Sequence, residues 1–299
     1  MLQCIKYKKA TSVFEIILAD ILWGLGFVAT IWALQTFSVY QSIFLRFGIV
    51  ASLCLPYIFF KFTYQTMLSF FKLSFLPAIF LMGEIFFQML GLKYTTATKA
   101  GFITILFIVL VPLIEKIFFL KKINKIHWLW VLVSIVGVKF ILGGEILSSL
   151  NFGDTMMLIS CLFASMHIIS IDRVSNKIDS PFAFNIYQVL WCFLFSVPFI
   201  FIDPIINLQN LTSISIIGLI IVSLGTTLLA FYFQLRAQKN IAASDASLLF
   251  LLESPLAAIF SFYFLNEQLI FSQLIGCGLV IAASVGVVLS SSSKMDQGL

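Results

Sequence analysis

Apolar runs long enough to cross a bilayer, joined by short polar connections, fill most of this sequence. A helix needs about 20 apolar residues to span the hydrocarbon core, and the chain contains ten runs of that kind. Only 10% of its residues are charged, against about 25% in soluble domains. The runs are too long for the strands of a membrane barrel and lack their alternation. We therefore predict an all-α integral membrane protein with ten transmembrane helices, over residues 13–34, 42–60, 73–92, 100–120, 128–147, 154–171, 182–202, 213–234, 246–265 and 269–290.

Two stretches, one in each half of the chain, follow the same plan. The first begins at Gly91 and the second at Leu235, and each is a short turn of basic and small residues before an apolar helix. Each helix carries one proline well inside it, Pro112 in the first half and Pro255 in the second. An internal duplication in a membrane protein of many helices is typical of a two-fold pseudosymmetric transporter.

The distribution of lysine and arginine predicts the orientation. With the N-terminus placed in the cytoplasm, thirteen basic residues lie in cytoplasmic segments, whereas the external loops hold only Lys93 and Lys99. This excess follows the positive-inside rule, so we expect both termini in the cytoplasm. Five helices per half is an odd number, and the second half therefore enters the membrane in the opposite direction. We expect two inverted five-helix repeats, over residues 1–145 and 146–299, an arrangement that supports alternating access.

Ordered motifs in both halves resemble those of one transporter family. In the first half they are Trp23-Gly24 with Phe27-Val28, the stretch from Tyr94 to Thr104, and Val111-Pro112-Leu113. In the second half they are Gly153-Asp154, Leu252-Glu253-Ser254-Pro255, Leu265-Asn266-Glu267-Gln268-Leu269, and Gly276 with Gly286. Together they resemble the EamA type of the drug/metabolite transporter superfamily. The resemblance implies ten helices in two EamA repeats and proton- or gradient-driven transport of small metabolites, often export of amino acids or related compounds.

One position departs from the family pattern. The family usually has a glutamate after the fourth helix, the counterpart of Glu267, and here that position holds Lys122. Lys122 would lie at the cytoplasmic face, where it adds to the basic charge that sets the orientation. The departure argues against a general role for the acid at Glu267.

Two acidic residues in the predicted helices are the candidates for proton coupling. A charge inside the bilayer costs at least a few kcal/mol, so each one needs a reason to be there. Glu84 lies near the middle of the third helix and shares a face with Gln88. A buried carboxylate without a cationic partner favours its protonated form, which makes Glu84 the first choice and Glu253 the second. The alternative is that Glu84 and Gln88 hold the bundle together through hydrogen bonds.

The first and second helices offer candidates for the wall of a substrate cavity. Asp20, Trp23 and Phe27 share one face of the first helix, where a carboxylate and two aromatic side chains could hold a cation or an aromatic group. The alternative is a helix-packing face with one acid that snorkels. Arg46, a few residues into the second helix, could anchor a substrate carboxylate or pair with Asp20. We favour a side chain that snorkels toward the outer headgroups.

Two prolines and a histidine complete the set of cavity candidates. Proline removes a backbone hydrogen bond, which a membrane tolerates only beside protein or a water-filled cavity. Pro112 and Pro255 are therefore expected to mark bends around a central site, with a static kink that improves packing as the alternative. His167 takes the place of Phe27 when the two halves are aligned, and it could bind substrate or relay protons. A structural hydrogen bond is the role we favour for it.

These observations predict secondary active transport of a small organic metabolite, an amino acid or related compound, exported across the bacterial inner membrane by proton-coupled alternating access. An uptake carrier or an exchanger for a nucleotide-derived or other metabolite is the alternative, and a membrane protein that transports nothing comes last. The sequence has no nucleotide-binding loop, no catalytic or metal-binding motif and no basic patch for nucleic acid. We therefore expect no enzyme activity, no cofactor or metal, and no nucleic-acid partner. The expected partners are the metabolite and membrane lipid, and a homodimer stays an open alternative.

Overall fold

The computed structural model describes residues 2–104, 106–142, 150–203 and 211–296, and every regular element within these ranges is helical. The α-helices are α1 (Leu2–Leu34), α2 (Val39–Lys61), α3 (Tyr64–Leu92), α4 (Ala97–Thr104), α5 (Phe107–Phe119), α6 (Lys125–Leu142), α7 (Phe152–Val174), α8 (Pro181–Ser196), α9 (Phe199–Ile202), α10 (Ser213–Ile220), α11 (Phe231–Ala237), α12 (Ala243–Leu249), α13 (Glu253–Leu265) and α14 (Phe271–Asp296). The π-helix η3 (Ile221–Ala230) joins α10 to α11, and the 3-10 turns η1 (Ser175–Lys177) and η4 (Phe250–Leu252) follow α7 and α12.

Eight helical segments within the described ranges are long and apolar enough to cross a membrane. They are Ala10–Leu34, Val39–Lys61, Tyr64–Leu92, Ala97–Phe119, Phe152–Lys177, Pro181–Ile202, Ser213–Ala237 and Ala243–Leu265. Two shorter apolar helices, Lys125–Gly137 and Phe271–Gly286, occupy the positions of the predicted fifth and tenth helices. The end of the predicted fifth helix, residues 143–147, lies outside the described residues.

Two of the predicted helices, one in each half, are interrupted near their middle. The fourth divides into α4 and α5, and the ninth changes from α12 through the 3-10 turn η4 into α13. Pro255 lies in the first turn of α13, where the missing N–H removes no intrahelical hydrogen bond. Pro112 lies further inside α5. The interruptions therefore precede the prolines, whereas the sequence predicted bends at the prolines themselves.

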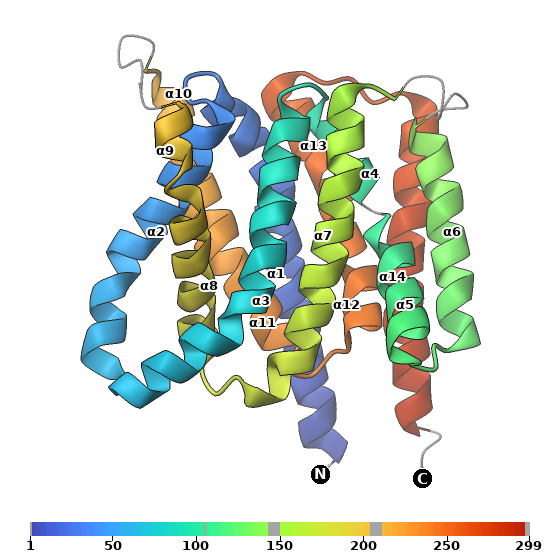
Figure 1. Ribbon diagram of the computed structural model, residues 1–299. Helices are drawn as coiled ribbons and strands as arrows, with labels where there is room; N and C mark the ends of the chain where they lie inside the picture. Colours follow the sequence, from blue (N-terminus) through green and yellow to red (C-terminus); the bar gives the residue numbers. More distant parts are fainter. Residues whose placement is uncertain (1, 105, 143–149, 204–210, 297–299) are drawn as a thin grey trace.

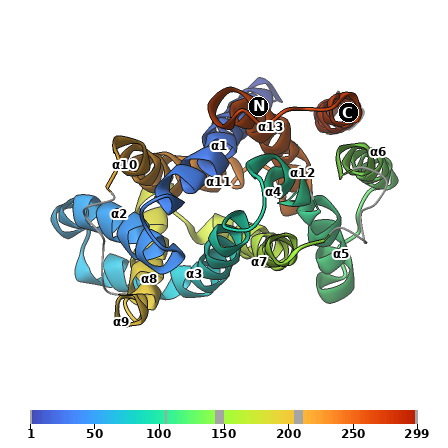
Figure 2. The ribbon, with the colours of Figure 1, turned by 90° about the horizontal axis from the view of Figure 1, so that it is seen from above.

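Helices of the first half pack in pairs with helices of the second half. In the middle of the bundle α3 packs along α7, and α1 packs along the continuous segment formed by α10, η3 and α11. Seen from above in Figure 2, α2 and α8 lie together at one edge of the bundle, and α6 and α14 lie together at the other. Helices from both halves therefore meet along the whole interior.

The start of α1 and the end of α14 lie at the same end of the bundle. In Figure 1, α1 begins and α14 ends at the lower end, which we call the terminal end, while α4, α7 and α10 begin at the upper, distal end. The distal contact between α7 and α3 depends on two glycines: a Cβ on Gly153 would lie 2.7 Å from the carbonyl oxygen of Gly91. Small residues of this kind let membrane helices approach closely.

Candidate functional site

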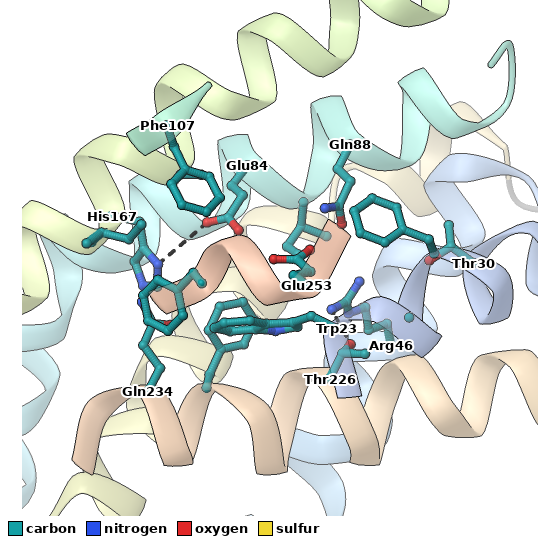
Figure 3. A pocket seen from close by; sticks show the side chains of 17 residues that line it. Trp23, Thr30, Arg46, Glu84, Gln88, Phe107, His167, Thr226, Gln234 and Glu253 are labelled. Carbon is teal, nitrogen blue, oxygen red and sulfur yellow. Dashed lines mark hydrogen bonds and ion pairs between the residues drawn. The ribbon is translucent and has the colours of Figure 1, made fainter. Parts of the chain in front are cut away.

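A cavity lies in the middle of the bundle, where the interrupted helices of both halves meet. Its volume is about 40 Å³, which is room for about three water molecules. Figure 3 places Arg46 and Thr226 at one end, His167 and Gln234 at the other, and Glu253 between them. The lining consists of Trp23, Gly26, Phe27, Thr30, Arg46, Glu84, Ile85, Gln88, Phe107, Ala164, His167, Ile168, Thr226, Phe231, Gln234, Phe250 and Glu253.

Aromatic rings form much of the cavity wall. The Trp23 ring packs edge-on against Phe231 and Phe250, with ring centroids 5.2 and 5.4 Å apart. Phe107 and Phe250 stand at the two helix interruptions, and their centroids lie 6.5 Å from each other. Edge-to-face contacts of this kind hold aromatic rings in defined orientations, so the apolar part of the cavity has a fixed shape.

Arg46 is the basic side chain of the cavity. It is only 2% exposed, and its Nε and Nη2 donate to the hydroxyls of Thr227 and Thr226 over 2.5 and 2.6 Å. The expectation that Arg46 snorkels toward the headgroups is therefore wrong, because two hydroxyls from the other half satisfy its donors inside the bundle. Among the described residues, no ion pair joins Arg46 to Asp20 or to another carboxylate.

The local geometry of η3 places these two hydroxyls side by side. Thr226 and Thr227 both donate to the carbonyl oxygen of Val222, each over 2.7 Å. The second of these bonds reaches back five residues, which suits the wider turn of a π-helix. From α8, the Asn185 amide donates to the carbonyl oxygens of Thr227 and Leu228, over 3.1 and 3.0 Å. Backbone groups that the irregular turn leaves open are thus satisfied within the protein, as the membrane interior requires.

Glu84 faces His167 across the cavity. His167 Nδ1 lies 3.5 Å from Glu84 Oε2, and Figure 3 marks this contact. The other ring nitrogen, Nε2, lies 3.0 Å from the side-chain oxygen of Gln188. If Nε2 carries the proton that it shares with Gln188, Nδ1 is free to accept one. Glu84 and His167 can then hold one proton between them, either on the carboxyl group or on the ring.

Glu253 is the second acid of the cavity. It begins α13 directly after η4 and is 8% exposed. No ion pair within the described part of the chain includes it. Gln88, one turn beyond Glu84 on α3, also lines the cavity. The site therefore combines one guanidinium, two carboxyl groups and an imidazole with aromatic walls.

Three of the predicted cavity residues lie away from the cavity lining. Asp20 is fully buried, and neither of its carboxylate oxygens has a hydrogen-bond partner among the described residues. Pro112 and Pro255 are buried inside α5 and α13 but do not contribute to the cavity wall. Of the face shared by Asp20, Trp23 and Phe27, the cavity therefore receives only the two aromatic residues.

Several cavity residues were missed from the sequence. Thr226 and Gln234 are polar residues inside an apolar run, and this alone would have marked them as candidates. Phe107 and Phe250 each stand five residues before the proline of their half, so alignment of the halves would have paired them. Phe231 gave no such signal, since phenylalanine occurs 34 times in the chain.

Polar contacts join the two halves at the distal end. Lys99 Nζ lies 2.5 Å from Asp154 Oδ2, and the Thr95 hydroxyl donates to the other oxygen of Asp154 over 2.7 Å. The Glu267 carboxylate accepts from the backbone N–H groups of Ala97 and Thr98, over 3.1 and 3.0 Å. A carboxylate at this place caps the start of α4 and interacts favourably with its dipole.

A corresponding set of contacts closes the terminal end. Arg236 Nη2 lies 2.8 Å from Glu15 Oε1, so that the end of α11 is joined to the first half of α1. Asp172 accepts from the backbone N–H of Ala243 over 3.2 Å and thereby caps α12. Glu267 thus caps α4, and Asp172 on α7 caps α12. Both helix starts have a capping carboxylate, although Lys122 replaces the acid that the family usually has at that position.

A bundle of apolar helices with charged groups gathered around a central cavity is the architecture of a membrane transporter. The model of the EamA-like transporter family matches residues 10–143 and 151–289. The chain belongs to this family and is a membrane transporter rather than an enzyme, in agreement with the resemblance found in the sequence.

Known proteins from one archaeon are similar over most of the chain. A protein of Archaeoglobus fulgidus, described as "Uncharacterized transporter", is 30% identical over 275 residues, which cover 91% of this chain and 84% of that protein. A second protein of the same organism and description is 26% identical over 215 residues, covering 70% and 71% of the two chains. A solved crystal structure aligns with a TM-score of 0.65 at 14% identity and covers 95% of this chain and 98% of its own, a likeness of fold alone.

Proposed function

We propose that this protein is a secondary active transporter that exports a small organic metabolite, an amino acid or related compound, across the bacterial inner membrane by alternating access. The observation that carries the proposal is the central cavity, where two carboxyl groups come from different halves of a transporter chain: Glu84, which faces His167, and Glu253. Charged groups inside a membrane are kept for a function such as binding or proton transfer.

The proposed architecture is two inverted five-helix repeats, with boundaries near residues 145 and 146. The two shorter apolar helices would complete ten spans. Contacts between the halves support the symmetry: α1 meets the α10–η3–α11 segment of the second half, as α7 meets α3 of the first. The start of α1 and the end of α14 lie at one end of the bundle, as expected for an even number of membrane spans. The basic residues near that end would keep it in the cytoplasm.

Alternation between two open states would use the contacts at the two ends. Breaking the Lys99–Asp154 pair would allow the distal end to open, and breaking the Arg236–Glu15 pair would allow the terminal end to open. The cavity, at about 40 Å³, is too small for a metabolite. Substrate entry would therefore require such a movement of the helices around it.

Proton coupling would pass through Glu84 and its neighbour His167. The pair can hold one proton, and loss of that proton would leave a second negative charge beside Glu253 in the same cavity. Binding of a cationic or zwitterionic substrate and binding of a proton would then compete for these carboxylates. Exchange of a proton for the substrate is the outcome of such competition.

The test is flux of labelled amino acids and related metabolites in proteoliposomes, with and without a pH gradient. We expect saturable flux that follows the gradient, and loss of the gradient dependence in Glu84→Gln or Glu253→Gln. Glu267→Gln is the matched control, because it makes the same change outside the cavity. Flux that rises linearly with concentration would indicate a channel, and absence of flux for the whole panel would contradict the proposal.

A further inference from the structure

We propose that the transported metabolite carries a carboxylate and that Arg46 binds it through the outer edge of its guanidinium. This inference rests on the proposed transport function and adds the substrate group that is recognised and the residue that holds it. A buried cation is strongly unfavourable unless an anion accompanies it. Neither Glu84 nor Glu253 lies within ion-pair distance of Arg46 in the described structure, so an anionic ligand can make the direct contact with the guanidinium that these two carboxylates do not make.

The donors that remain on Arg46 suit a carboxylate. A guanidinium has five N–H donors in a planar fork. Thr227 receives the Nε donor and Thr226 receives one donor of Nη2, which leaves three. The edge formed by Nη1 and Nη2 therefore keeps a donor on each nitrogen, and two parallel N–H donors match the two oxygens of a carboxylate. Arg46 is one of the residues that line the cavity (Figure 3).

The arginine is held in place before the ligand arrives. Each threonine hydroxyl donates its own proton to the Val222 carbonyl and so presents a lone pair to the guanidinium. Asn185 fixes the backbone of the same turn from α8. A side chain with four rotatable bonds would otherwise lose conformational entropy on binding, and a fixed one loses little. Thr226 and Thr227 are thus positioning residues for the anchor.

The other lining residues of the cavity indicate which further groups the ligand carries. Beyond Arg46 the wall is aromatic, formed by Trp23, Phe231 and Phe250, and it suits an apolar or aromatic side chain. Glu253 lies between Arg46 and the His167 end (Figure 3), and its carboxylate would attract an ammonium group of the same ligand. An amino acid fulfils all three conditions, whereas an amine without a carboxylate leaves Arg46 unpaired.

Binding to the purified protein tests the inference separately from transport. The probes are the L-amino acids, each compared with its own primary amide, which keeps the ammonium and side chain but lacks the carboxylate charge. We expect at least one acid to bind, and its amide to bind about 10- to 100-fold more weakly, the range for a charge-assisted hydrogen-bonded pair. In Arg46→Gln the ratio of acid affinity to amide affinity should fall close to one, and Arg46→Lys should keep only part of the preference for the acid.

The positioning residues supply a second variant in case Arg46→Gln does not fold. Thr226→Val combined with Thr227→Val should reduce the preference for acid over amide several-fold. Ser223→Ala is the control: it removes a hydroxyl that donates to the Leu219 carbonyl in the same π-helix without touching Arg46, and the preference should stay as in the parent. A change in folding alone would not alter the ratio between two ligands of one protein preparation.

Three results would overturn the inference: amides that bind as tightly as the acids, an unchanged preference in Arg46→Gln and in the double threonine variant, or no binding by any acid. Flux measured in the same preparation separates this failure from that of the proposed function. Acid binding through Arg46 without any flux would contradict transport and leave the anchor standing. Saturable flux of compounds without a carboxylate, unaffected by Arg46→Gln, would support transport and contradict the role of Arg46 as the anchor.

Discussion

Neutralising Asp154 should open the distal end of the protein. Its carboxylate accepts from Lys99 Nζ, the Thr95 hydroxyl and the backbone N–H of Asn151. A hydrogen bond to a charged group contributes about 1.5–3 kcal/mol, but Lys99 is 30% exposed and water screens part of that energy. We therefore expect Asp154→Asn to destabilise the closed distal end by about 1–2 kcal/mol, which corresponds to about a 5- to 30-fold larger population of the open state.

The assay is the labelling rate of a cysteine placed at Gln88, in the cavity, by a membrane-impermeant thiol reagent added from outside. The native cysteines are first replaced. Labelling should accelerate by the same 5- to 30-fold factor in Asp154→Asn. Glu15→Gln, which removes the Arg236 pair at the terminal end, is the matched control and should slow external labelling. Equal rates in Asp154→Asn and its parent, or acceleration by Glu15→Gln, would refute this account of the two ends.

Three further changes test the packing and the helix starts. Gly24→Val should lower stability by about 1–3 kcal/mol, since a Cβ at Gly24 would lie 2.8 Å from that of Leu256; an unchanged thermal unfolding midpoint in detergent would contradict this. Glu267→Gln should cost about 1 kcal/mol through the weakened cap of α4, with the gradient dependence of flux retained. Asn185→Leu removes two hydrogen bonds to η3, and we expect both a loss of about 1–3 kcal/mol and a weaker preference for acids over amides. An intact preference in that variant would mean that the π-helix does not depend on Asn185.

Helix positions followed from the sequence because the length of an apolar run is set by the bilayer and can be counted along the chain. The surroundings of single side chains could not be obtained in this way. Arg46 was expected to reach the headgroups, and it instead meets Thr226 and Thr227, which belong to the other half of the chain. A partner so distant in sequence becomes visible only when the packing of the halves is known.

Helical periodicity also identified only part of the cavity wall. Asp20 shares a face with Trp23 and Phe27, but a cavity one or two turns long cannot include a whole helical face. Asp20 lies outside its limit. The prolines were misleading for a related reason: the interruptions fall before Pro112 and Pro255, where Phe107 and the turn around Phe250 contribute to the cavity instead.

The π-helix η3 also sets the rotation of α11 around its own axis. Its turn contains more residues than an α-helical turn, so a return of one such turn to α geometry would shift every later residue by one position and rotate it by about 100° around the axis. Phe231 and Gln234 follow η3 directly on α11 and face the cavity in the present register. The two threonine hydroxyls that hold Arg46 bond across this same turn. Loss of the contact between Arg46 and the two threonines would therefore favour rotation of α11. The segment η3–α11 would in this way link binding at the Arg46 end of the cavity to the position of Phe231 and Gln234.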